Sequence, residues 1–177
     1  MGTFVKSDRQ PCRILGIDPG LNITGYGVIE LDSSGRIGTG RVRLIEAGVI
    51  RSRAKAPIED RLKELFEGVQ EVIEQHCPTD MALEQLFSHY ERPRTAILMG
   101  HARGVICLAA GLANISVTHY EPTRVKRMMT GNGRAPKHQM QLAVKAQLGL
   151  AAAPEPADVA DALAIALCHQ ATVGELQ

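Results

Sequence analysis

The chain has 177 residues and a mass of 19.1 kDa, which is the usual size of one domain. Hydrophobic residues make up 45% and charged residues 22% of it, so the composition is that of a globular protein and excludes collagen-like, disordered and disulfide-scaffold classes. The formal net charge of +1 gives by itself no sign of a nucleic-acid partner.

The N-terminal part of the chain predicts a leader followed by a small sheet. Residues 1–12 are mostly polar and lack periodicity, so we expect a flexible leader before a single domain over residues 13–172. Strands are predicted over residues 13–18, 25–31 and 41–50. Because their connections are short, these three strands should form an antiparallel meander.

The pattern then alternates between helices and strands. Apolar residues recur every three or four positions over residues 57–75, which indicates an amphipathic helix with Pro57 at its start. The elements expected after it are a strand at 80–84, a helix at 95–111, a strand at 115–120, and helices near 122–129, 136–148 and 156–171. This order predicts an α/β fold with a mixed five-stranded sheet and helices on both faces.

Neither a targeting signal nor a metal-binding cysteine motif is evident. We expect no apolar run to approach the roughly 18 residues that span a bilayer. The sequence therefore predicts a soluble, cytoplasmic protein that does not contact a membrane. The four cysteines lie far apart without a CxxC pair, which disfavours both a zinc site and a disulfide framework.

Charge is distributed unevenly along the chain. Residues 92–154 contain nine Lys or Arg and one acid, Glu121, so they carry +8 and the remainder carries −7. A basic segment joined to an acidic one suits a polyanion held near metal ions. Acids on solvated helices would give the same count, and for residues 59–74 that is the favoured interpretation.

Two acids follow apolar strand patterns. Asp18 ends the first predicted strand before a Pro-Gly turn, and Glu84 ends the run Met81-Ala-Leu. Ligands of open α/β sheets bind at the carboxyl ends of strands, so both acids are candidate site residues. Turn chemistry explains either acid alone equally well.

Two more acids open the last predicted helix. Asp158 and Asp161 are three residues apart after Pro156 and so share one helix face. The helix dipole favours an acid such as Asp158 in the first turn. It explains Asp161 poorly, because that carboxylate lies among Ala, Leu and Ile residues, where it needs a partner or a cation.

Four carboxylates brought together would repel one another unless a divalent cation neutralised them. An oxygen-only ligand set suits Mg²⁺ or Mn²⁺, and two such ions could clamp the attacking and leaving oxygens of a phosphodiester. The sequence therefore predicts phosphoryl transfer, with the basic segment holding the substrate backbone.

An ordered set of short motifs between about Arg13 and His169 resembles the RuvC family of Holliday junction resolvases. The motifs are ILGIDPG from Ile14, TGYGV from Thr24, EQLF from Glu84, GHARG from Gly100, Val125-Lys126, Gly131-Asn-Gly133 with Lys137, and DVADALAIA from Asp158. The resemblance implies a ribonuclease H-like fold and a homodimer. It also implies a metal-dependent endonuclease that makes paired symmetric nicks at four-way DNA junctions in homologous recombination and DNA repair.

The resemblance also assigns roles to residues of this chain. Asp18, Glu84, Asp158 and Asp161 match the family's acidic quartet, in an all-carboxylate version, because some members have His at the position of Asp158. They would hold two Mg²⁺ ions, with Mn²⁺ able to substitute, and the cut would leave 5′-phosphate and 3′-hydroxyl ends. A hand-over of the junction from the RuvA–RuvB branch-migration complex is a further expectation.

The expected DNA contacts rest on the same resemblance. Phe87 matches an aromatic residue that stacks on an unpaired base, although a core Phe would fit as well. Lys126 and Lys137 match lysines near the DNA backbone, where plain surface lysines are the alternative. The segment after Phe87 departs from the family pattern, and its Arg92 and Arg94 would add phosphate contacts.

Two pairs of glycines leave alternatives open. Gly25 and Gly27 weaken a predicted strand, which indicates either close approach by another backbone or substrate, or a β-bulge. Gly131 and Gly133 could place backbone N–H groups near a phosphate, or form an ordinary turn.

Other functions remain as alternatives. A related ribonuclease H-like nuclease that acts on RNA precursors shares the Asp-Pro-Gly strand, and a non-catalytic junction-binding scaffold is a second alternative. Actin-like kinases and ATPases begin with a similar strand but need two such domains, which 177 residues do not supply. The small-residue helix at residues 95–111 is our candidate for a homodimer interface.

Overall fold

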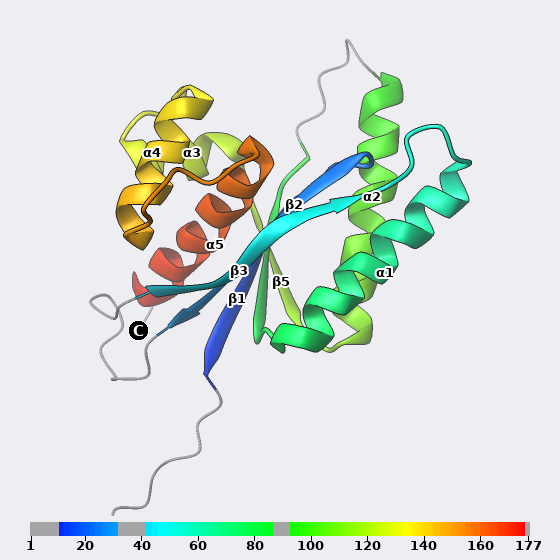
Figure 1. Ribbon diagram of the computed structural model, residues 1–177, viewed down its shortest axis with the longest axis horizontal. Helices are drawn as coiled ribbons and strands as arrows, with labels where there is room; N and C mark the ends of the chain where they lie inside the picture. Colours follow the sequence, from blue (N-terminus) through cyan, green and yellow to red (C-terminus); the bar gives the residue numbers. More distant parts are fainter. Residues whose placement is uncertain (1–10, 32–41, 87–92, 176–177) are drawn as a thin grey trace, which may run out of the picture.

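The computed structural model describes residues 11–31, 42–86 and 93–175, which form a five-stranded sheet with helices on both faces (Figure 1). The strands are β1 Cys12–Asp18, β2 Ile23–Leu31, β3 Val42–Arg51, β4 Asp80–Glu84 and β5 Ser116–Tyr120. The helices are α1 Ile58–His76, α2 Pro93–Leu112, α3 Pro122–Thr130, α4 Lys137–Leu148 and α5 Ala157–Glu175. The predicted order of elements is confirmed, and residues 1–10 of the expected leader lie outside the described residues.

The sheet is mixed, as predicted. Its strand order is β3-β2-β1-β4-β5, with β1, β2 and β3 paired antiparallel and with β4 and β5 parallel to β1. In the pairing of β1 with β4, Ile17 lies opposite Leu83. The next residues along these strands, Asp18 and Glu84, therefore reach the same edge of the sheet together.

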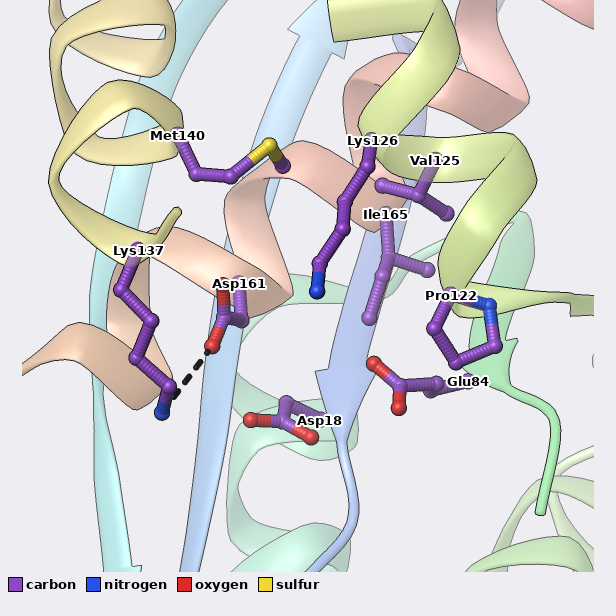
Figure 2. A pocket seen from close by; sticks show the side chains of 9 residues that line it. All are labelled: Asp18, Glu84, Pro122, Val125, Lys126, Lys137, Met140, Asp161 and Ile165. Carbon is purple, nitrogen blue, oxygen red and sulfur yellow. Dashed lines mark ion pairs between the residues drawn. The ribbon is translucent and has the colours of Figure 1, made fainter. Parts of the chain in front are cut away.

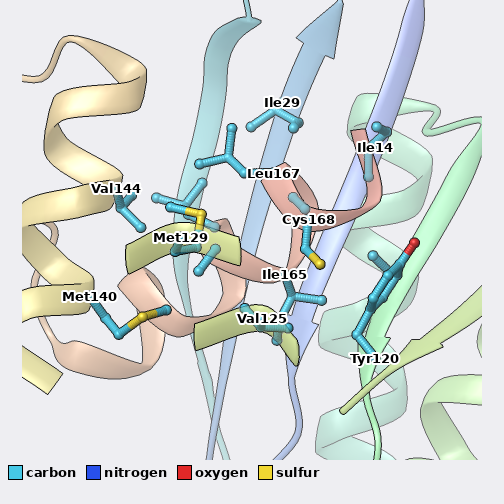
Figure 3. Packing of buried hydrophobic residues seen from close by; sticks show 14 of the residues in the cluster. Ile14, Ile29, Tyr120, Val125, Met129, Met140, Val144, Ile165, Leu167 and Cys168 are labelled. Atoms are coloured by element: carbon cyan, nitrogen blue, oxygen red, sulfur yellow. The ribbon is translucent and has the colours of Figure 1, made fainter. Parts of the chain in front are cut away.

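Two aliphatic layers bury the faces of the sheet. Along β1, Ile14 packs towards α5, whereas Leu15 and Ile17 pack towards α1 and α2, as the alternation of a strand requires. Figure 3 shows the first layer, where Val125 of α3 and Ile165 of α5 close over the sheet. Each fully buried Ile or Leu contributes about 1.5–3 kcal/mol. Because helices cover both faces of the sheet, the ends of the strands are where a ligand can reach them.

Helix α5 lies unusually close to β2 because glycines face it. A Cβ added at Gly25 would lie 2.1 Å from the carbonyl oxygen of Asp158, and one at Gly27 would lie 2.4 Å from a leucine side chain of α5. Close approach of α5 therefore explains both glycines, through a backbone carbonyl at Gly25 and a leucine side chain at Gly27. A register irregularity also occurs nearby, between Val28 and Ile29. The contact holds the first turn of α5 against the end of the sheet where β1 and β4 stop.

Helix α2 corrects the expectation that no apolar run of this chain approaches the length that spans a bilayer. By length and composition alone it is long and apolar enough to cross a membrane, which is weak evidence, because helices of soluble proteins pass the same test. Its apolar side chains are not hidden in the described part of the chain: Ile97, Leu108 and Leu112 are 61%, 56% and 63% exposed. Helix α2 thus presents an apolar face that no other described element covers.

Candidate active site

The two strand-end acids meet at one edge of the sheet. Asp18 is the last residue of β1, and Glu84 is the last residue of the neighbouring parallel strand β4. Asp18 pairs with Gly25, whose missing side chain would point at α5, so the Asp18 side chain lies on the α5 face. The strand pattern thus directs this carboxylate beneath the start of α5.

The other two acids come from the start of α5. Asp158 lies in the first turn of the helix, and Asp161 follows one turn later. The Asp161 side chain is 22% exposed, although its neighbours along α5 are buried apolar residues. The same packing of α5 on Gly25 that positions the helix therefore brings Asp161 to the strand-end acids.

Three of the four acids line one cleft of about 220 Å³ (Figure 2). Asp18, Glu84 and Asp161 form its acidic part. Asp158 does not line it, but its negative charge raises the pKa of both Asp18 and Asp161. The rest of the cleft is lined by Pro122, Val125, Lys126, Lys137, Met140 and Ile165.

Asp18 has the most perturbed acidity in the cleft. Burial, followed by the charges of Glu84, Asp161 and Asp158, raises its pKa to about 8, against the opposing effect of Lys137. Desolvation and like charges both disfavour the ionised carboxylate. Without a cation, Asp18 would hold a proton near neutral pH.

Glu84 and Asp161 are perturbed in the same direction. Burial and the charge of Asp161 raise the pKa of Glu84 to about 7, although Lys126, Arg103 and Lys137 act to lower it. The pKa of Asp161 is raised mainly by burial. Several acids with raised pKa values at one place are typical of a functional site, and a divalent cation bound there would favour their ionised forms.

The two predicted lysines reach the acids. Figure 2 shows Lys126 of α3 and Lys137 of α4 extending into the cleft from the side opposite the sheet. The Lys137 Nζ atom is 3.7 Å from an Asp161 carboxylate oxygen. Both ammonium groups are therefore placed beside the acids, where a bound phosphodiester would meet them.

The donor set fits a hard divalent cation, because every acidic side chain offers oxygen ligands. In the described part of the chain, however, no group of three or more Asp, Glu, His or Cys side chains is already close enough to hold a metal ion. The acids surround the cleft and have not converged on one point.

The remaining predicted DNA contacts fall elsewhere. Phe87 and Arg92 lie outside the described residues. Arg94 is exposed near the start of α2 and does not line the cleft. Gly131 adopts a left-handed conformation with φ of 75° and caps α3 by donating its N–H to the carbonyl oxygen of Arg127. That N–H is already used within the turn, which favours the ordinary-turn interpretation.

Sequence reasoning missed one cation that acts on the site. Arg103 lies on α2, on the opposite side of the sheet from α5, yet its charge lowers the pKa of Glu84. Its guanidinium donates a hydrogen bond to Nδ1 of His119, with a distance of 2.9 Å. The motif Gly100-His-Ala-Arg-Gly contained this residue, but no sequence signal connected it to Glu84.

Comparisons of the sequence with known proteins match the same protein family. A family model described as crossover junction endodeoxyribonuclease RuvC matches residues 14–169, a span that contains all four acids. The protein of that name from Rhodopirellula baltica is 62% identical over 170 residues, which cover 95% of this chain and 92% of the relative. The one from Desulforamulus reducens is 46% identical and covers 88% of this chain and 91% of the relative.

A solved structure agrees. Thermus thermophilus RuvC in complex with a Holliday junction substrate is similar to this chain with a TM-score of 0.82 and 32% sequence identity, over 93% of this chain and 96% of that one. The similarity extends over the sheet and both helical layers.

Proposed function

The chain belongs to the RuvC family of crossover junction endodeoxyribonucleases, and from this premise we propose that the cleft at the sheet edge cuts four-way DNA junctions. The protein is a Holliday junction resolvase with a ribonuclease H-like fold. It acts by paired symmetric nicks that leave 5′-phosphate and 3′-hydroxyl ends, in homologous recombination and DNA repair. The observation that carries the proposal is the family match over residues 14–169, within which three half-buried acids and two lysines share one cleft.

The metal ions are assigned to the acids. Asp18, Glu84, Asp158 and Asp161 would hold two Mg²⁺ ions, and Mn²⁺ would substitute. The oxygen-only donor set and the raised pKa values of Asp18 and Glu84 support this assignment. When bound, such ions lower the pKa of the attacking water and stabilise the leaving 3′ oxygen.

The lysines and the apolar wall orient the substrate. Lys126 and Lys137 are suited to bind non-bridging oxygens of the scissile phosphate, because both extend into the cleft beside the acids. Met140 and Ile165 limit the room for bulk water on the same side. We assign Phe87, Arg92 and Arg94 to contacts with the rest of the junction, on the basis of the sequence.

Symmetric cleavage requires two active sites related by a two-fold axis, so the working unit is a homodimer. The exposed apolar face of α2 supports its assignment as the interface, because it exposes large apolar side chains next to small ones. We further propose that the protein works in the cytoplasm and receives the junction from the RuvA–RuvB complex.

A nicking assay tests the function. The purified chain is incubated with Mg²⁺ and end-labelled substrates: a synthetic four-way junction, linear duplex DNA of the same sequence, and structured RNA. The proposal requires paired nicks in the junction only. Cleavage of the RNA alone would favour the RNA-precursor nuclease, and junction binding without nicking would favour the scaffold.

A further inference from the structure

The turn that follows Asp18 is closed by a buried threonine. The Oγ1 atom of Thr24 donates a hydrogen bond to the carbonyl oxygen of Gly20 at 2.6 Å and accepts one from the Gly20 N–H at 3.2 Å. The Thr24 side chain is fully buried. One hydroxyl therefore satisfies both backbone groups of Gly20, inside the turn that joins β1 to β2.

The two sides of this turn are packed tightly against each other at Gly20. A Cβ at Gly20 would lie 2.1 Å from the carbonyl oxygen of Ile23, so the two backbone segments are in contact across the turn. Only a residue without a side chain permits this approach. The hydrogen bonds of the Thr24 hydroxyl to Gly20 hold the two sides of the turn together at the same place.

The outer side of the turn is braced by the segment after β3 and by α1. The N–H of Ser52 donates to the carbonyl oxygen of Asn22 at 3.1 Å, and its hydroxyl donates to the carbonyl oxygen of Leu21. The guanidinium of Arg61 donates to the side-chain oxygen of Asn22. The segment after β3 and helix α1 thus hold the four-residue connection between β1 and β2, in addition to Thr24 of β2.

What the turn carries explains this support. Asp18 ends β1 immediately before the turn, and its carboxylate lines the cleft with Glu84 and Asp161, so the shape of the turn sets where this carboxylate lies. Thr24 itself points to the opposite face of the sheet, since its neighbour Gly25 faces α5. Thr24 therefore acts on the site through the backbone, without contacting a substrate or an ion.

We propose that Thr24 is a positioning residue for the cleavage reaction, because its hydroxyl fixes the turn from which the Asp18 carboxylate reaches the metal ions. The inference rests on the proposed function, which assigns Asp18 to metal binding. It requires the hydroxyl of Thr24 and not merely its bulk. Thr24→Val keeps the shape and removes the hydrogen bonds, whereas Thr24→Ser keeps the hydrogen bonds.

Three variants in the full chain test the proposal. Thr172→Val is the matched control, since it removes a threonine hydrogen bond of 2.9 Å to the carbonyl oxygen of Cys168, near the other end of α5. Each variant is measured for thermal unfolding, for amide exchange at Gly20 in metal-free buffer, for Mg²⁺ binding by calorimetry, and for junction cleavage across a Mg²⁺ titration.

Thr24→Val should remain folded at the assay temperature and should bind junction DNA without metal as the wild type does. Its Gly20 amide should exchange faster, it should bind Mg²⁺ more weakly, and its cleavage rate should fall by about tenfold to a hundredfold, as a displacement near 1 Å of a reacting group can cause. Thr24→Ser should recover most of the rate, and Thr172→Val should cleave like the wild type.

Two results would overturn the inference while leaving the function intact. One is a Thr24→Val protein that cleaves at the wild-type rate with an unchanged Mg²⁺ requirement. The other is a Thr24→Ser protein as slow as Thr24→Val, which would assign the effect to packing of the methyl group. Failure of the wild-type chain to nick the junction would instead refute the proposed function itself.

Discussion

Lys137 holds its ammonium nitrogen 3.7 Å from a carboxylate oxygen of Asp161. The lysine is 69% exposed, so by the measure of exposed ion pairs this contact stabilises the fold by at most about 1 kcal/mol. Its larger effect is on acidity, because the same positive charge acts to lower the pKa of Asp161, Asp18 and Glu84. The pair is therefore better understood as part of the site than as a support of the fold.

Lys137→Met should raise the pKa of Asp161 in the metal-free protein, because the ionised carboxylate loses its nearest cation. Carboxyl ¹³C chemical shifts followed across a pH titration would measure this. The free energy of unfolding should change by less than about 0.5 kcal/mol, as for most surface substitutions. Lys145→Met on the same helix is the control and should leave the Asp161 titration unchanged. An unchanged titration in Lys137→Met would show that solvent screens the pair completely.

Metal-free stability should depend on pH through Asp18. Its pKa of about 8 in the folded chain exceeds the value near 3.8 expected when unfolded, so the unfolded state loses this proton first as the pH rises. Stability is then greatest below about pH 4 as far as this group is concerned, and is lost progressively up to about pH 8, by on the order of a few kcal/mol.

Asp18→Asn removes this titration. With a chelator present, its free energy of unfolding should exceed that of the wild type at pH 8, and the difference should shrink towards pH 4. Urea unfolding at several pH values measures both proteins, and titrating groups outside the cleft cancel in the comparison. A difference that does not change with pH would contradict the raised pKa.

The positions of the four acids could be predicted from the sequence where they follow from local patterns, but not where they depend on tertiary packing. Asp18 and Glu84 could be predicted as neighbours, because each ends a strand pattern and parallel strands end together. Asp158 and Asp161 could be predicted to share a helix face from their spacing. The packing of α5 against Gly25, which joins the two pairs, is tertiary, and the sequence left it open between close approach and a bulge.

The two lysines and Thr24 have tertiary contacts that local sequence patterns do not predict. Lys126 and Lys137 come from different helices, and family resemblance, not spacing, indicated that they converge. Thr24 precedes the strand predicted at residues 25–31, and no pattern assigns it a role, because its partner Gly20 lies across a turn whose conformation no periodicity encodes. The exposure of the apolar side chains of α2 could not be predicted either, since an apolar helix pattern does not show which element covers it.

Asp161→Asn should abolish cleavage and leave the fold intact. The substitution preserves shape but removes the charge that a divalent cation needs, and the rate should fall by at least about a hundredfold, more than loss of an outer contact to a metal ligand costs. Circular dichroism and junction binding without metal should match the wild type. Nicking of the junction at the wild-type rate with Mg²⁺ would refute the assignment of Asp161.

Gly25→Ala should disturb both stability and cleavage. The new methyl group would lie 2.1 Å from the carbonyl oxygen of Asp158, so the start of α5 must shift, at a cost of about 1–3 kcal/mol. Gly111→Ala is a suitable control, since no described atom lies within 4 Å of a Cβ added there. Urea unfolding and nicking rates would be compared, and a Gly25→Ala protein that is as stable as the control would show that α5 does not press on β2 here.

Leu108→Glu should separate the proposed dimer. Leu108 is 56% exposed within the chain, so a charge costs the monomer little, but burying that charge in an interface against the same face of a second copy is strongly unfavourable. Leu142→Glu, at a residue 47% exposed on α4, is the matched control. Sedimentation should give a monomer for the first variant and a dimer for the second, and the monomer should lose paired nicking. If Leu108→Glu sedimented as a dimer, α2 would not be the interface, and a two-fold axis would have to be sought on another face.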